Sequence, residues 1–183
     1  RANMTLGLLT ETGLLSAENQ AQAILLQRLV NDSLSAVTYP AYLAGLGYSI
    51  NVSDSGFAIS VNGYQDKQMA LLKTVTERLF STAISTERFT TIKSSLIKDW
   101  RNSSKDKPYL QALGALGDTF LSGSWPATTL ADALEPINLD ALLQWRRQQL
   151  KTVGVIAALH GNVRVADAEQ LRDFLNTTIK PKT

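Results

Sequence analysis

The sequence predicts an α+β domain of two layers, with a mainly antiparallel sheet and helices packed on one face of it. Three observations lead to this fold class. Residues 44–64 hold two short runs of alternating apolar and polar residues, residues 153–159 form a short apolar run, and most other segments repeat apolar residues at helical spacing. Strands combined with long helical segments are typical of a helical layer packed on a sheet. With 183 residues, the chain suits a single domain, 1–183, that buries about 70 % of its unfolded surface.

The stretch 44–64 is predicted to be a β-hairpin. Apolar and polar residues alternate on both sides of Asp54-Ser55-Gly56, and Gly56 tolerates the positive φ that the turn requires. The alternation places one set of side chains under the helices: Tyr48, Ile50, Val52, Phe57, Ile59 and Val61. It places Ser49, Asn51, Ser60 and Asn62 on the other face.

The chain before the hairpin predicts a strand and two helices. Residues 4–9 alternate weakly and are expected to form the strand. Ser16 is the expected N-cap of a helix that continues to about Leu34. Because Pro40 has no N–H and disfavours helix at Tyr39, we expect a break there and a second, short helix over residues 40–45.

The chain after the hairpin is predicted to be mostly helical. The expected helices begin near Asp66, at Ser85 or Thr86, near residue 108, near residue 129 and at Asn138; the one over residues 108–120 is weakened by Gly114 and Gly117. Residues 153–159 are almost continuously apolar, which predicts a central strand. A last helix should turn Ala168, Leu171 and Leu175 inward, and residues 180–183 should form a tail.

The composition excludes several classes of function. The 18 basic and 16 acidic residues give a net charge of +2 and are spread along the chain, so neither nucleic acid nor a membrane surface is an expected partner. No run of about 18 apolar residues is present to span a membrane. The absence of cysteine excludes disulfides and thiolate metal sites. The chain opens at Arg1 without Met, and we interpret it as a piece of a longer protein.

Four short motifs occur in one order along the chain. They are Ala44-Gly45-Leu46-Gly47-Tyr48, Val61-Asn62-Gly63-Tyr64-Gln65-Asp66-Lys67-Gln68, Thr86-Glu87-Arg88-Phe89 and Leu159-His160-Gly161-Asn162. Together they resemble the repeated domain of the pitrilysin and insulin-degrading-enzyme family of zinc metallopeptidases, peptidase family M16. The resemblance extends over residues 4–175 and is strongest to the third of the family's four domains, which lacks the zinc site. It implies the α+β fold of the pitrilysin/LuxS-type repeat, near-complete here but missing an N-terminal strand.

The resemblance raises the question of zinc. The family's catalytic repeat binds zinc through H-x-x-E-H on a helix and a glutamate from a later helix, and the Glu between the two His acts as base. The helix in that place here, Asn19–Leu29, has no His and no Glu, and the later ligand would fall in Ser94–Leu96, which has no carboxylate. We therefore expect no catalytic, cofactor-binding or metal-ligating residue in this chain, with zinc bound elsewhere in the parent enzyme.

Other candidates for chemistry have simpler interpretations. His160, the single histidine, suits a general base by its titration range, but no Ser, Cys or paired carboxylate is adjacent in sequence, which favours a role in ending the strand. The pairs Gly45/Gly47 and Gly114/Gly117 do not complete a nucleotide-binding loop, which favours helix ends and close packing.

The aromatic and charged residues each leave two interpretations open. One interpretation is that the aromatic residues line a peptide channel: Trp100, Trp125, Trp145, Tyr42, Tyr48 and Tyr64. Core packing is favoured for Trp100 and Trp145, whereas Trp125 is expected outside the core, in contact with a neighbouring domain. The charged residues of the helix that begins at Ser85 or Thr86, and of the loop after it, are expected to form a solvated face, with a docking surface as the alternative. They are Lys93, Lys98, Asp99, Arg101, Lys105, Asp106 and Lys107.

The resemblance implies a non-catalytic domain of a zinc metalloendopeptidase, which forms part of a chamber around peptide substrates and contacts other domains of the same parent chain. Two alternatives stay open: a scaffold or interaction domain of a catalytically inactive M16 relative, and part of a processing protease of cofactor biosynthesis. The fragment itself is expected to be inactive. Bacterial relatives favour the periplasm as the compartment, with the cytoplasm as the alternative.

Overall fold

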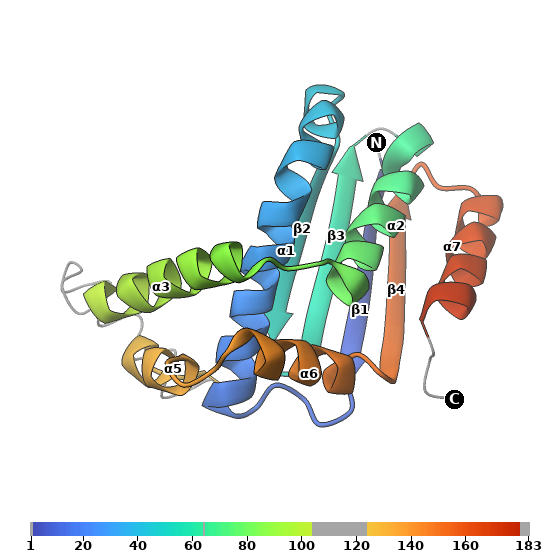
Figure 1. Ribbon diagram of the computed structural model, residues 1–183. Coiled ribbons are helices and arrows are strands. Elements are labelled where there is room, and N and C mark those ends of the chain that lie inside the picture. The colour runs from blue at the N-terminus through green and yellow to red at the C-terminus, as the bar shows by residue number, and fades with distance from the viewer. Residues whose placement is uncertain (1, 64, 104–123, 180–183) are drawn as a thin grey trace.

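The computed structural model describes residues 2–63, 65–103 and 124–179. Its four strands form one antiparallel sheet in the order β2-β3-β1-β4, and helices α1, α2, α3 and α6 lie on one side of that sheet (Figure 1). The strands are β1 (Ala2–Thr10), β2 (Gly47–Ser53), β3 (Gly56–Gly63) and β4 (Val153–Gly161). The helices are α1 (Ala17–Leu43), α2 (Gln65–Ser81), α3 (Thr86–Asn102), α5 (Ala127–Leu134), α6 (Leu139–Gln149) and α7 (Val165–Thr178). This is the α+β fold that the sequence predicts.

The core lies between the sheet and the helical layer. Strand β1 contributes Met4, Leu6 and Leu8, which lie opposite Val61, Ile59 and Phe57 of β3. The predicted register of the hairpin is confirmed, because Ile50, Phe57, Ile59 and Val61 are buried and Tyr48 and Val52 are half-buried. Gly56, at φ 144°, is required in the turn, since a Cβ there would collide with the carbonyl oxygen of Leu8.

Three of the predicted helix starts are confirmed by their caps. Ser16 accepts a hydrogen bond from the backbone N–H of Asn19 at 3.1 Å, and Ser85 accepts one from Arg88 at 3.2 Å. The side chain of Asn138 accepts one from Ala141 at 2.8 Å. Each cap satisfies a backbone donor that the first helical turn leaves free. The helix predicted over residues 108–120 and the tail over residues 180–183 lie outside the described residues.

The predicted break at Pro40 is wrong, because α1 continues through Pro40 to Leu43. Pro40 removes only the hydrogen bond to the carbonyl of Ala36, and Ala36 is exposed, so water can replace it. Packing holds the last turns in place, since Thr38 is buried and its hydroxyl donates to the carbonyl of Leu34 at 2.9 Å. The short helix expected over residues 40–45 is therefore the end of α1.

The prediction of a central strand at residues 153–159 is also wrong. Strand β4 lies at the edge of the sheet, and β1 occupies the position between β3 and β4. The apolar run has a different cause: Val153 is buried and Val155 and Leu159 pack against the core, whereas Ile156 on the other face is 61 % exposed. An apolar run indicates that side chains contact the core. It does not indicate whether the strand is hydrogen-bonded to a neighbour on one side or on both.

The inward face of α7 differs from the prediction by a small rotation. Leu171 is buried and Leu175 half-buried as expected, but Ala168 is exposed and Phe174 is buried in its place. Asp167 is buried as well, and its carboxylate accepts a hydrogen bond from the backbone N–H of Arg164 at 2.8 Å. None of the described helices is both long enough and apolar enough to span a membrane.

Candidate functional site

The segment Asn19–Leu29, where the family's zinc helix would lie, forms the first half of α1 and packs into the core. Leu25 and Leu26 are fully buried and Leu29 is nearly so. The amide of Gln27 is already engaged, since its Nε2 donates to the backbone carbonyl of Ile50 in β2. This face of α1 therefore presents leucine side chains to the core, and these cannot ligate a metal.

The second segment, Ser94–Leu96, lies on α3, which packs against α1. Leu96 is fully buried, and Ser94 and Ser95 are exposed. Two ion pairs join the helices: Arg28 to Asp99 at 3.3 Å, and Arg88 to Asp32. The described residues contain no group of three or more His, Cys, Asp or Glu that could hold a metal ion. The side chains of these two segments do not fit zinc.

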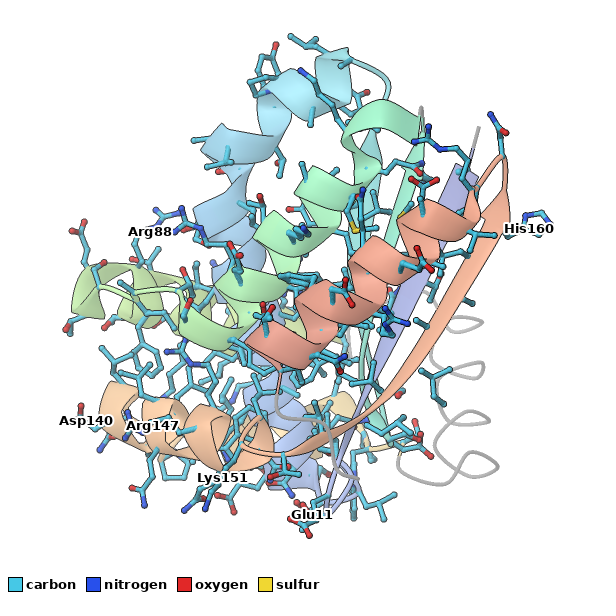
Figure 2. The ribbon with its side chains drawn as sticks, turned by 90° about the vertical axis from the view of Figure 1, so that its right-hand side faces the viewer. Glu11, Arg88, Asp140, Arg147, Lys151 and His160 are labelled. Carbon is cyan, nitrogen blue, oxygen red and sulfur yellow. The ribbon has the colours of Figure 1, made fainter. Side chains whose placement is uncertain are left out.

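His160 lies on β4, one residue before the strand ends and opposite Asn3 of β1. Figure 2 shows it pointing away from the helical layer. It lines an open hollow of about 510 Å³ with Ala2, Asn3, Asn62 and the glycines 45, 63 and 161, and none of the described lining residues is a serine or a carboxylate. Gly161 has a φ of 102° and turns the chain after the strand. This geometry agrees with the interpretation that His160 ends the strand.

The charged residues of α3 have partners on neighbouring elements. Lys93 donates from Nζ to the carbonyls of Glu135 and Ile137 at 2.8 and 2.6 Å, and Arg101 pairs with Glu135 at 2.8 Å. Burial lowers the pKa of the Lys93 ammonium, and the nearby Glu135 carboxylate opposes that shift. The expectation of a solvated face holds for Asp99 and Arg101, which are exposed although each forms an ion pair, whereas Lys93 is half-buried. These charges dock α3 onto α1 and onto the end of α5; residues 105–107 lie outside the described part.

The face of the sheet opposite the helices, here called the second sheet face, carries small uncharged side chains. The register places on it Ser49, Asn51, Ser53, Ala58, Ser60, Asn62, Asn3, Thr5, Gly7, Leu9, Gly154, Ile156, Ala158 and His160. None of these positions is Asp, Glu, Lys or Arg. Thr5 and Ser60 share a hydrogen bond between their hydroxyls, 3.1 Å across β1 and β3.

Comparison with known proteins identifies the family. The model of the middle or third domain of peptidase M16 matches residues 1–133. The chain belongs to peptidase family M16. The human insulin-degrading enzyme is 31 % identical over 157 residues, covering 86 % of this chain and 15 % of the relative, and the mouse enzyme is 33 % identical over 157 residues with the same coverage. A Schizosaccharomyces pombe relative that is named a zinc protease is 26 % identical over 184 residues, 100 % of this chain and 19 % of that protein.

Solved structures show the same fold. The crystal structure of pitrilysin superimposes with a TM-score of 0.85 at 23 % identity, over 97 % of this chain and 19 % of pitrilysin. A conserved protein from Enterococcus faecalis superimposes with a TM-score of 0.71 at 20 % identity, over 99 % of this chain and 48 % of that one. This M16 domain thus spans roughly a sixth of the length of its curated relatives, about 15 to 19 %.

Trp145 and Trp100 pack in or against the core and Trp125 lies outside it, as the sequence predicts, whereas Tyr64 lies outside the described residues. Trp145 is buried, and its Nε1 donates to Asn19 at 2.9 Å. Trp125 is 37 % exposed and donates to the carbonyl of Leu15 at 2.9 Å, outside the core. Sequence reasoning did not single out Tyr39, which the structure brings beside Tyr42 and Tyr48. The sequence shows four large apolar residues close together, Val37, Tyr39, Tyr42 and Leu43, and the structure exposes all four. Because a break in the helix was predicted at Pro40, these residues were not recognised as parts of one helix end.

Proposed function

We propose that this chain is a non-catalytic middle domain of a longer M16 zinc endopeptidase and that it forms part of the wall of a chamber around peptide substrates. The observation that carries the proposal is the packing of Asn19–Leu29, whose leucines fill the core where the family's catalytic repeat has its zinc ligands. In this proposal the domain keeps the fold of the repeat without its zinc ligands, and its role in the enzyme is structural.

Zinc belongs, in this proposal, to another domain of the longer polypeptide. Bound there, it would lower the pKa of a water molecule and so supply the nucleophile for peptide hydrolysis. Residues of the present chain take no part in that step. Their contribution is to position neighbouring domains and to exclude bulk water from the enclosed substrate.

The second sheet face supports the wall role. It offers hydroxyl and amide groups for hydrogen bonds and carries no fixed charge, so it does not repel peptides of either sign. The M16 relatives are larger proteins, among them an insulin-degrading enzyme and a relative named a zinc protease, which supports a protease as the parent.

The test compares three preparations: the full-length polypeptide, the same polypeptide without residues 1–183, and the 183-residue chain alone. We expect zinc and peptide cleavage in the first, zinc without cleavage in the second, and neither in the third. The control is a full-length Arg172→Ala variant, a change at an exposed position of α7 away from the second sheet face, which should retain activity. One equivalent of zinc bound by the isolated chain at micromolar affinity contradicts the proposal, as does normal activity of the deletion variant. A full-length polypeptide with no zinc site and no activity would favour the scaffold alternative.

A further inference from the structure

We draw no further inference here: the strongest candidate, the hollow of about 400 Å³ at the end of α1 that Tyr39, Tyr42 and Tyr48 line, presents an apolar surface, and nothing in the structure shows what covers it.

Discussion

Arg88 on α3 donates from Nε and Nη2 to the two carboxylate oxygens of Asp32 on α1, so that a planar guanidinium faces a planar carboxylate. The same Arg88 lies in the Thr86–Phe89 motif that carries part of the family resemblance. In this M16 domain the pair joins the two helices that would hold zinc ligands in a catalytic repeat.

The first prediction concerns this pair. Replacing either residue with alanine should lower the thermal midpoint slightly, because both side chains are partly exposed and water screens their attraction. A double-mutant cycle measured by thermal melts should show a coupling at low salt that disappears at about 1 M salt. The exposed neighbours Arg172 and Asp173 serve as the control pair, with no coupling at either salt concentration. A coupling that persists in high salt would mean that packing, and not charge, links the helices.

The second prediction concerns the register of the hairpin. Phe57→Ala should reduce the free energy of unfolding by about 3–5 kcal/mol, because Phe57 is buried between sheet and helices. Ser60→Ala should cost about 1 kcal/mol, the value of its hydrogen bond with Thr5. Urea unfolding curves measure both. Similar losses in the two variants would contradict the observed pairing of β2 with β3.

The third prediction concerns Pro40. Pro40→Ala should raise the free energy of unfolding by about 1 kcal/mol. A proline inside a helix costs up to about 3 kcal/mol relative to alanine. Part of this gain is offset because the unfolded chain has more conformational freedom with alanine than with proline. The control is Pro126→Ala at the N-cap of α5, where no helical hydrogen bond is missing and no gain is expected. Loss of stability in Pro40→Ala would show that contacts of the proline ring outweigh the missing hydrogen bond.

The fourth prediction concerns Tyr48. Burial raises the pKa of its hydroxyl, and the hydrogen bond with Thr38 opposes part of the shift. In the unfolded chain a tyrosine ionises at about pH 10, so above that pH the unfolded state loses the proton first and the free energy of unfolding falls. Titration of tyrosinate absorbance in the wild type and in Tyr48→Phe should show one hydroxyl, missing from the variant, that ionises above pH 10. A missing step at or below pH 10 would contradict the burial of Tyr48.

Local patterns predicted those parts of the fold that depend on neighbours in sequence. Ser16, Ser85 and Asn138 each bond a backbone N–H three residues ahead, so the capping residues could be recognised without the fold. The hairpin followed from alternation alone. The absence of His and Glu from Asn19–Leu29 likewise needed no structure.

Features that depend on tertiary packing could not be predicted in this way. Propensity favours a break at Pro40, but the burial of Thr38 and Leu34 holds the helix together. The apolar residues of β4 did not reveal whether its backbone pairs on one side or two. Tyr42 at a helix end and Tyr48 on a strand line one hollow, and only the turn at Gly45 makes them neighbours.

The position of β1 has a consequence for the synthesis of the chain. Ala2, among the first described residues, pairs with Gly63 on one side and with Gly161 on the other. Because β4 comes last of the four described strands along the chain, β1 acquires its second partner only after β4 has left the ribosome. Until then β1 presents an unpaired edge on that side, to which another chain can pair, and a premature stop anywhere before β4 would make that exposure permanent.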